Sequence, residues 1–362
     1  MLRTALYQTH KRLGARLIDF GGWEMPVMYG GIAEEHVYTR TVSTIFDVSH
    51  MGRLVLTGPD AEAVLQYVCT RNVAKLAVGR SGYSHVCNAD GGVMDDVIVS
   101  RDEKRWIVVC NAGNREKVVA HLLEQLRGRN ASLEDTTQQT VMMAVQGPAT
   151  MRLFAEHMPI KIDEMKRYGF ASGKYMGQAY TVFRSGYTGE DGLEIVVSAA
   201  TGALVWDYLT KDGGQDRPTI KPAGLGARDT LRTEAGMPLY GHELTEQTDP
   251  LSAGCGWCVE LEKSFIGVEA LRRIAADGPR RKITGLILDG RRIARQDSKV
   301  YDGEAEVGIV TSGTFAPTLQ KSIAMAFIDA PLSKEGQSLE VGIKDGRAPA
   351  TVVCLPFYKR RF

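Results

Sequence analysis

The first half of the chain shows strand-like and helix-like hydrophobic patterns in a regular order. Short apolar runs predict strands, a Gly-Pro pair opens a helix with apolar residues at helical spacing, and a glycine-rich turn predicts a hairpin. The predicted order is strand, helix, strands, helix. These elements lie at residues 53–57, 58–68, 83–87 with 97–100, 106–110 and 115–126.

The same order recurs further along the chain. Its elements lie at residues 141–145, 148–158, 180–184 with 193–197, and 204–209. In both stretches a Gly-Pro pair follows the first strand and one strand of the hairpin carries an acid, Asp96 or Glu194. We therefore predict a duplicated α+β unit in which these two acids are pseudo-equivalent and face a shared cleft.

Beyond residue 282 the pattern changes to short strands punctuated by glycine. Near-regular spacing of these strands predicts a separate β-barrel or sandwich of about 80 residues. We expect the polar stretch 275–281 to be the linker that precedes it. The five predicted strands lie at residues 283–288, 306–310, 324–327, 339–343 and 350–354.

Composition narrows the class of protein. The chain has 362 residues, 44% hydrophobic and 24% charged, which suits an ordinary globular protein of two or three domains. A net charge of +1 does not favour nucleic acid or an anionic membrane as the main partner. No apolar run approaches the ~18 residues of a membrane span, and the N-terminus lacks a signal sequence, so we expect a cytoplasmic protein.

The six cysteines are scattered, and only Cys255 and Cys258 form a CxxC pair. No second pair and no histidine pattern accompanies them, which favours buried, reduced thiols over a metal or redox site. Three histidines at positions 36, 50 and 85 also lack metal-ligand spacing, so no metal is predicted.

Two acids stand in strands that are otherwise apolar. Burying an unpaired carboxylate costs several kcal/mol or raises its pKa, so such acids need a partner. Asp96 and Glu194 therefore indicate a mostly apolar small-molecule pocket with a few fixed acids. The two-residue period of a strand places Asp95 and Asp96 on opposite faces without choosing between them, and an acid that caps a turn is the simpler alternative.

The segment Ala227-Arg-Asp-Thr-Leu-Arg232 carries two arginines spaced by one helical turn. Arg228 and Arg232 could share a face and meet an anionic or polar ligand. The alternative is that both form ion pairs with Asp229 and Glu234.

Several segments together resemble the aminomethyltransferase, or T-protein, family of the glycine cleavage system. The resemblance runs from about Leu6 to Arg360, and it is the joint occurrence of the segments in family order that makes it specific. The segments are Phe20-Gly-Gly-Trp-Glu-Met-Pro-Val-Met-Tyr29, Phe46-Asp-Val-Ser-His-Met-Gly52, Gly91-Gly-Val-Met-Asp-Asp-Val-Ile-Val99, Asn111-Ala-Gly-Asn-Arg-Glu-Lys117, Ser185-Gly-Tyr-Thr-Gly-Glu-Asp-Gly192, Gly226-Ala-Arg-Asp-Thr-Leu-Arg-Thr-Glu-Ala-Gly-Met-Pro-Leu-Tyr-Gly241 and Thr311-Ser-Gly-Thr-Phe-Ala-Pro-Thr-Leu319.

This resemblance implies an α+β fold of three domains in a cloverleaf around a central channel. The implied domains are residues 1–51 with 129–275, residues 52–128, and a C-terminal β-barrel at 282–362. It also implies that the channel holds tetrahydrofolate, which accepts the carbon of an aminomethyl group from a lipoylated H-protein while ammonia leaves. The implied product is 5,10-methylenetetrahydrofolate.

The resemblance also implies roles for single residues. Asp96 matches the acid that serves the chemical step, Glu194 the acid that accepts the paired N–H donors of the pterin, and Arg228 an arginine on the pterin's polar side. Further matching folate contacts are Tyr83, Met51, Asn111, Tyr187 and Trp257.

Each of these further residues has an ordinary structural alternative. An isolated Tyr or Met is more often a core residue than a ligand contact. Asn111 could cap the following helix, and Trp257 could pack on the domain core. His50 is expected to be a structural histidine with satisfied hydrogen bonds rather than an acid or base.

Two other functions remain open. Related folate-binding proteins that support iron–sulfur cluster assembly carry a Cys where this chain has Lys263-Ser-Phe-Ile-Gly-Val-Glu269, which counts against that function. Folate-dependent demethylases share the fold, and those acting on sulfonium compounds also share the length. The basic cluster Lys359-Arg-Arg361 is one candidate docking surface for an acidic carrier. The alternatives are a solvated tail without contacts and a tail that meets the glutamate carboxylates of the folate.

Overall fold

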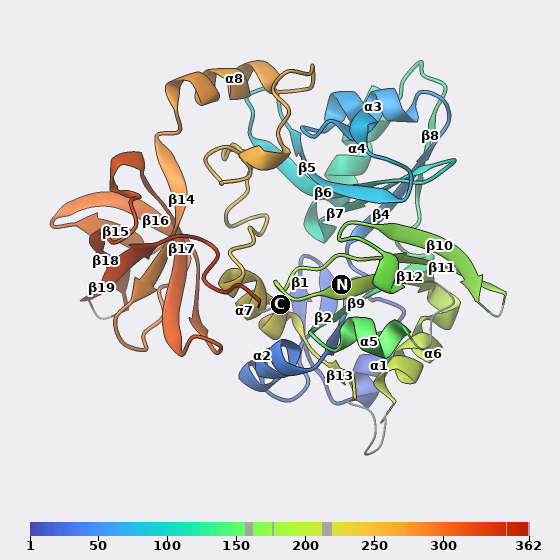
Figure 1. The fold of residues 1–362 in the computed structure, drawn as a ribbon, viewed down its shortest axis with the longest axis horizontal. Coiled ribbons are helices and arrows are strands. Elements are labelled where there is room, and N and C mark those ends of the chain that lie inside the picture. The colour runs from blue at the N-terminus through green and yellow to red at the C-terminus, as the bar shows by residue number, and fades with distance from the viewer. Residues whose placement is uncertain (156–161, 176, 212–218, 345, 361–362) are drawn as a thin grey trace. The chain divides into compact units, whose positions relative to one another are not determined.

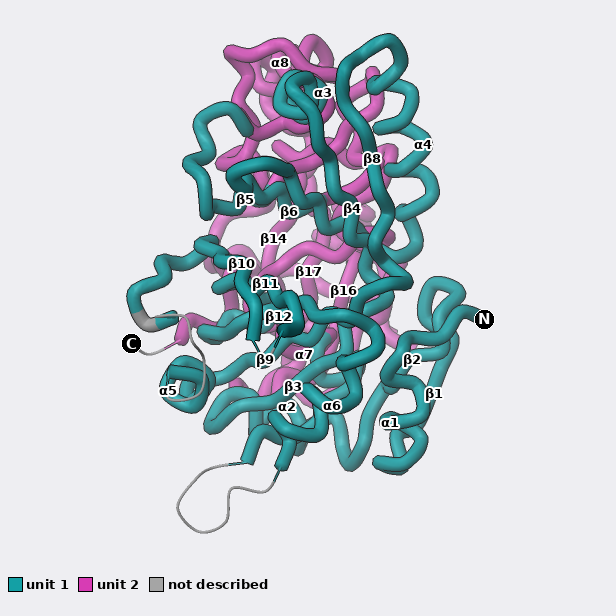
Figure 2. Tube along the Cα trace, turned by 90° about the vertical axis from the view of Figure 1, so that its right-hand side faces the viewer, with its two compact units in different colours: residues 1–66, 73–83, 97–228 teal, residues 67–72, 84–96, 229–362 magenta. Residues whose placement is uncertain are grey.

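The structure is a computed structural model that describes residues 1–155, 162–175, 177–211, 219–344 and 346–360 (Figure 1). The chain forms two compact units (Figure 2). Unit 1 comprises residues 1–66, 73–83 and 97–228, and unit 2 comprises residues 67–72, 84–96 and 229–362.

Unit 1 contains a six-stranded sheet. The strands are antiparallel except for the last, which pairs parallel to its neighbour. In spatial order they are β10 (Phe170–Tyr175), β11 (Gln178–Phe183), β12 (Gly192–Ser198), β9 (Thr140–Gln146), β3 (Thr44–Asp47) and β13 (Lys221–Pro222).

A second sheet has five strands, and two of them, β5 and β6, are divided between the two units. In spatial order they are β5 (Arg80–Cys87), β6 (Val93–Arg101), β7 (Trp106–Cys110), β4 (Gly52–Thr57) and β8 (Ser132–Asp135). The helices that follow β4 and β7 are α3 (Ala61–Val68) and α4 (Arg115–Gln125).

The predicted duplication is confirmed in the order of elements. β4, α3, β5, β6, β7 and α4 correspond to β9, α5 (Thr150–Ala155), β10, β11, β12 and α6 (Ala199–Thr210), and each set of four strands has the same spatial order. The predicted end of α5 at Met158 lies outside the described residues.

The predicted equivalence of Asp96 and Glu194 is wrong. Each repeat has three strands between its helices, and the sequence prediction missed β10 in the second repeat. Its residues Phe170-Ala-Ser-Gly-Lys-Tyr175 form an edge strand in which only Phe170 is buried, so they carry little apolar signal. Asp96 lies on β6, the second of the three strands, whereas Glu194 lies on β12, the third.

The Gly-Pro pairs at the starts of α3 and α5 have a common steric cause. Gly58 and Gly147 have φ values of +102° and +139°, which L-residues with a side chain rarely adopt. A Cβ atom would stand 2.5 Å from the Asn130 carbonyl oxygen at Gly58 and 2.4 Å from that of Val42 at Gly147. Both turns therefore require glycine.

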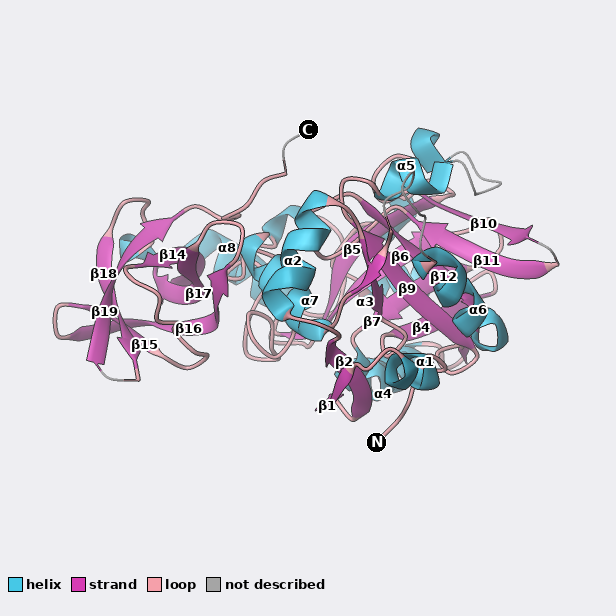
Figure 3. Cartoon of the chain, turned by 90° about the horizontal axis from the view of Figure 1, so that it is seen from below, coloured by secondary structure: helices cyan, strands magenta, loops and turns pink. Residues whose placement is uncertain are grey.

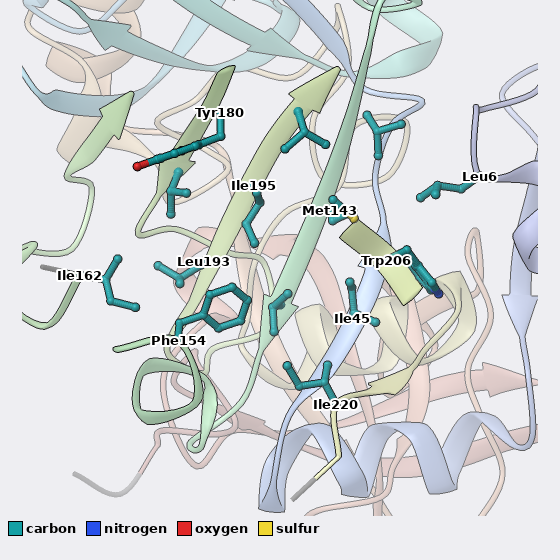
Figure 4. Packing of buried hydrophobic residues seen from close by; sticks show 14 residues of the cluster. Leu6, Ile45, Met143, Phe154, Ile162, Tyr180, Leu193, Ile195, Trp206 and Ile220 are labelled. Atoms are coloured by element: carbon teal, nitrogen blue, oxygen red, sulfur yellow. The ribbon is translucent and has the colours of Figure 1, made fainter. Parts of the chain in front are cut away.

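The core of unit 1 lies between the six-stranded sheet and its helices (Figure 4). Alternate residues of β9 and β12 point into it, and α5 and α6 cover this face of the sheet with Phe154 and Trp206, which are 2% and 0% exposed. The strand residues of this cluster are Ile45, Val141, Met143, Val145, Tyr180, Val182, Leu193, Ile195 and Val197. Residues between these positions point to the opposite face.

Unit 2 contains a closed barrel of six antiparallel strands (Figure 3). The predicted barrel is confirmed, but the count of five strands is wrong because β15 was missed: it is short, and only Val300 in Lys299-Val-Tyr-Asp302 is buried. In barrel order the strands are β14 (Arg281–Leu288), β17 (Lys321–Asp329), β16 (Ala305–Ala316), β15 (Lys299–Asp302), β18 (Ser338–Ile343) and β19 (Gly346–Val353).

The predicted linker at 275–281 is partly wrong, since α8 (Val268–Asp277) includes its first residues. The domain boundaries at residues 51, 128 and 281 stay a prediction.

No helix among the described residues is long and apolar enough to cross a membrane. The remaining helices and strands are α1 (Tyr7–Arg12), β1 (Arg16–Phe20), β2 (Trp23–Met28), α2 (Ile32–Thr41) and α7 (Leu225–Glu234), with 3₁₀ turns at Val73–Lys75, Ala112–Asn114, Ile162–Glu164, Gly256–Cys258 and Ala330–Leu332.

Candidate functional site

Glu194 lies on the face of the six-stranded sheet that α5 and α6 do not cover. Its neighbours Leu193 and Ile195 point into the core, so the two-residue period of β12 turns Glu194 the other way. On this face it stands opposite Ala144 of β9 and Phe183 of β11. The carboxylate is half-buried, which makes it a group that a ligand can reach.

A loop between β11 and β12 supplies a partner for Glu194. The hydroxyl of Ser185 donates a hydrogen bond to Oε2 of Glu194. Gln146 holds this loop, because its Nε2 donates to the carbonyl of Ser185 at 3.1 Å and its Oε1 accepts from the Thr188 hydroxyl at 3.0 Å. Gly186 is required here, since a Cβ atom would stand 1.8 Å from Oε1 of Gln146.

Two arginine–carboxylate pairs fix the rest of the loop. Arg184 donates to both oxygens of Asp191 at 3.1 and 2.6 Å, and Arg40 donates to Glu190 at 2.9 Å and to the Thr188 carbonyl at 2.6 Å. The side chains of Arg40 and Glu190 are only 5% and 4% exposed. The loop is therefore held rigidly, and it presents Tyr187 between these anchors.

Arg228, on α7, stands over that tyrosine. Its guanidinium carbon lies 4.7 Å from the centre of the Tyr187 ring, a cation–π geometry. Burial lowers the pKa of Arg228, while the charge of Glu194 opposes this shift. Among the described residues the guanidinium finds no hydrogen-bond acceptor, and its Nη1 is enclosed by protein atoms without a partner. The alternative that Arg228 forms an ion pair with Asp229 or Glu234 is therefore wrong.

Arg53 is a buried arginine whose guanidinium has hydrogen-bond acceptors within the protein. Arg53 is 2% exposed and donates to the carbonyls of Ser49, Met51, Thr137 and Thr140 and to the Thr140 hydroxyl. Arg232 is likewise paired with Glu243 at 2.9 Å and with Asp229 at 2.8 Å. Arg228 alone of these three arginines has a charged group without an acceptor, so it is the one suited to a ligand.

The turn that follows β3 carries His50 and Met51. Asp47 fixes its start, because Oδ1 accepts from the Ser49 N–H at 2.8 Å and Oδ2 accepts from the Thr4 hydroxyl at 2.7 Å and contacts the His10 ring at 2.9 Å. Burial acts to raise the pKa of Asp47, but the hydrogen bond and charge of His10, with the other donors, lower it to about 2.

The hydrogen bonds of Asp47 make the free energy of unfolding depend on pH. The pKa of Asp47 is below its unfolded value of about 3.9, so its contribution is present above pH ~4 and is lost as the pH falls toward 2. The free energy of unfolding of the wild type should drop by about 2 kcal/mol more than that of Asp47→Asn between pH 6 and pH 2.5, measured by urea unfolding. The matched control is Asp207→Asn, which removes an exposed pair with Arg12 and should keep the wild-type pH dependence. Parallel curves for wild type and Asp47→Asn would contradict this account.

Asp96 belongs to unit 2 and lies on β6. Burial alternates along this strand, so that Asp95 is fully buried and Asp96 is half-buried on the other face, as the strand period predicts. Its charge acts on the thiols of Cys255 and Cys258. Burial raises the pKa of both thiols, that of Cys258 to about 12, and the charge of Asp96 adds to the shift.

The CxxC pair is buried, as expected. Cys255 and Cys258 are 4% and 3% exposed, and the Cys258 thiol donates to the Cys255 carbonyl at 3.1 Å. Thiols with raised pKa are poor nucleophiles and poor metal ligands. The residues that the structure describes contain no group of three or more His, Cys, Asp or Glu side chains arranged to hold a metal ion.

The other predicted contact residues take different positions. Trp257 is 62% exposed with the Arg71 guanidinium 5.8 Å from its ring, so the alternative that it packs in a core is wrong. Asn111 occupies the N-cap position of the turn Ala112–Asn114, and its side chain makes no capping hydrogen bond within this fully described segment. Tyr83, Met51 and Tyr187 are half-buried rather than core residues.

The structure thus brings Glu194, Arg228 and Tyr187 together in unit 1, with Ser185 as a partner that the sequence did not single out. Ser185 lies in the same glycine-rich segment as Tyr187, but nothing in the sequence shows the direction of its hydroxyl. Asp96 and Trp257 lie in unit 2. Arg361 of the basic cluster lies outside the described residues.

Comparisons with known proteins identify the family of this chain. Residues 6–263 match the GCVT N-terminal domain, and residues 281–359 match the glycine cleavage T-protein C-terminal barrel domain. The chain belongs to the glycine cleavage T-protein family.

Relatives in this family are similar over nearly their full lengths. An aminomethyltransferase of Rubrobacter xylanophilus is 45% identical over 361 residues, covering 99% of this chain and 95% of the relative. One of Herpetosiphon aurantiacus is 42% identical, covering 100% and 99%. The crystal structure of the glycine cleavage system aminomethyltransferase T from Bartonella henselae superposes with a TM-score of 0.93 at 32% identity, covering 99% of both chains. The chain is an aminomethyltransferase of this family.

Proposed function

We propose that this chain transfers the methylene carbon of an aminomethyl group, carried on the lipoyl arm of the H-protein, to tetrahydrofolate. A folate nitrogen forms a bond to the carbon as the carbon–nitrogen bond breaks and ammonia leaves. The second folate nitrogen then displaces the lipoyl sulfur, which leaves as a thiol. The product is 5,10-methylenetetrahydrofolate, and the proton released by each attacking nitrogen needs an acceptor.

The observation that carries the proposal is a carboxylate and a nearby guanidinium whose hydrogen-bonding capacity the described protein leaves largely unused. The Glu194 carboxylate accepts one hydrogen bond, from Ser185, and the Arg228 guanidinium donates none to the described residues. A carboxylate binds adjacent N–H donors and a guanidinium binds ring oxygen or nitrogen acceptors. The aminopyrimidine edge of a reduced pterin offers both kinds of atom.

The family match supports roles for the other residues. Asp96 serves the chemical step, either by accepting a proton or by stabilising the cationic species that forms when ammonia leaves. Tyr187 and Met51 contact the folate beside Arg228, and Tyr83, Asn111 and Trp257 contact it elsewhere. Trp257 has the exposed ring face that stacking on an aromatic group requires.

The proposal extends to the setting of the reaction. The lipoylated H-protein is the partner, neither a metal nor a nucleic acid takes part, and the site of action is the cytoplasm. Six free cysteines, five of them buried, support a reducing compartment.

Exchange of single arginines tests the folate site. Arg228→Met should weaken tetrahydrofolate binding by about 100-fold, because charge-assisted hydrogen bonds worth about 1.5–3 kcal/mol are lost. Its melting temperature should not fall, because no hydrogen bond within the described protein is broken. Calorimetric titration and thermal unfolding measure the two effects.

The matched control is Arg53→Met, which removes a buried guanidinium that has carbonyl partners. Its melting temperature should fall because those buried carbonyls lose their donors. A folded Arg228→Met protein that binds tetrahydrofolate as tightly as the wild type would contradict the proposal for this residue.

A further inference from the structure

His50 is a buried histidine without the hydrogen bonds that such a residue normally has. It is 2% exposed, and no described residue donates to or accepts from either ring nitrogen. Its ring stands edge-to-face to that of Phe20, at a centroid distance of 5.5 Å and an interplanar angle of 88°. The expectation of a satisfied structural histidine is therefore wrong.

His10 is a buried histidine that does have hydrogen-bond partners, in contrast to His50. His10 is also fully buried, but its ring contacts the Asp47 carboxylate at 2.9 Å and the Tyr29 hydroxyl at 2.8 Å. Buried polar groups in folded proteins are almost always hydrogen-bonded, and an exception needs an explanation. A chain that needed only volume at position 50 would be more stable with an apolar ring.

Burial and neighbouring charges also determine the protonation state of His50. Burial lowers its pKa to about 3, and the positive charges of Arg228 and Arg53 act in the same direction, against Asp47. The ring is therefore neutral at physiological pH, with one N–H donor and one lone pair. It lies close enough to Arg228 to feel the charge of that guanidinium, which also has no hydrogen-bond partner among the described residues.

The two ring nitrogens of His50 differ in whether another molecule can reach them. Nδ1 is enclosed by protein atoms and has no partner. Nε2 also has no partner, but it is not among the enclosed atoms, so it is the nitrogen that another molecule can reach.

We propose that His50 contacts the substrate and determines specificity, with Nε2 hydrogen-bonded to an uncharged nitrogen of the reduced pterin ring beside Arg228. This inference rests on the proposed folate function. Arg228 and His50 then divide the recognition: the guanidinium supplies charged donors, and the neutral imidazole supplies a contact that does not repel it. The protein keeps a poorly satisfied polar group because the substrate completes its hydrogen bonding.

The test uses the full-length protein and three variants of one residue. His50→Phe should raise the melting temperature by about 2 °C, since an unsatisfied buried polar group is removed, while tetrahydrofolate affinity falls about 10-fold. His50→Gln places an amide near the position of Nε2 and should restore most of the affinity. His50→Asn, whose amide lies near the position of Nδ1, should not. His121→Gln is the matched control, because His121 also has a buried unsatisfied Nε2 but no coupling to Arg228, and its affinity should equal that of the wild type.

A second probe locates the contact on the substrate. The His50→Phe effect should persist with 6-methyltetrahydropterin, which has the pterin ring but lacks the aminobenzoylglutamate tail. Loss of the effect with this probe would overturn the pterin assignment, and equal affinity of His50→Phe and wild type for tetrahydrofolate would overturn the inference as a whole. Failure of the wild type to bind tetrahydrofolate would instead refute the proposed function.

Discussion

Replacing Asp96 with asparagine should lower kcat by about 100-fold or more while the fold persists, because the side chain keeps its shape and loses its charge. Asp96 is half-buried on β6, on the strand face opposite to that of the fully buried Asp95. A carboxylate that takes part in chemistry must be reachable by the reacting atoms, and of the two acids only Asp96 is. Steady-state assays with aminomethyl-lipoyl H-protein and tetrahydrofolate measure the loss.

The matched control is Asp95→Asn, one residue away on the same strand. Because Asp95 is 0% exposed, its substitution should change stability more than kcat. Near-wild-type turnover in purified Asp96→Asn would refute the assignment. A larger loss of kcat in a folded Asp95→Asn protein would move the role to the neighbour.

Replacing Arg232 with methionine should lower the free energy of unfolding by about 3–5 kcal/mol, because it leaves the Glu243 carboxylate buried without its counter-charge. Both side chains are 1% exposed and their atoms are 2.9 Å apart. Arg232 also donates to the Ser312 hydroxyl at 2.7 Å, and Ser312 donates to Glu243 at 2.6 Å. Denaturant unfolding measures the loss.

Two further variants separate this effect from a general loss of charge. Arg272→Met removes an exposed pair with Glu269, whose side chains are 41% and 76% exposed, and should cost less than about 1 kcal/mol. The double variant Arg232→Met with Glu243→Leu should recover part of the stability, since no unpaired charge remains. An Arg232→Met protein as stable as Arg272→Met would show that the buried network contributes little.

Strong local patterns made much of the fold predictable from sequence. The repeated order of strands and helices, the Gly-Pro pairs at Gly58 and Gly147 and the late run of glycine-punctuated strands all follow from local sequence. The missed strands, β10 and β15, are short or largely exposed and carry few buried apolar residues. The omission of β10 in turn produced the wrong equivalence between Asp96 and Glu194.

The site was less predictable because the role of each side chain depends on hydrogen-bond partners that are distant in sequence. The sequence alone does not distinguish the roles of three arginines, Arg53, Arg228 and Arg232. Arg53 finds acceptors at Thr137 and Thr140, 84 and 87 residues away, whereas Arg228 finds none among the described residues. No local pattern distinguishes a satisfied arginine from one left for a ligand. The same holds for His50, which was expected to be satisfied.

The central claim is that the chain converts an aminomethyl group on a lipoylated carrier into the methylene bridge of folate. The most direct measurement supplies purified protein with aminomethyl-lipoyl H-protein and tetrahydrofolate and quantifies ammonia and 5,10-methylenetetrahydrofolate together. A parallel reaction replaces the carrier with a sulfonium methyl donor. We predict equal amounts of ammonia and methylenetetrahydrofolate with the carrier and no folate product with the sulfonium compound. Methyl transfer from the sulfonium compound, without ammonia release from the carrier, would contradict the account.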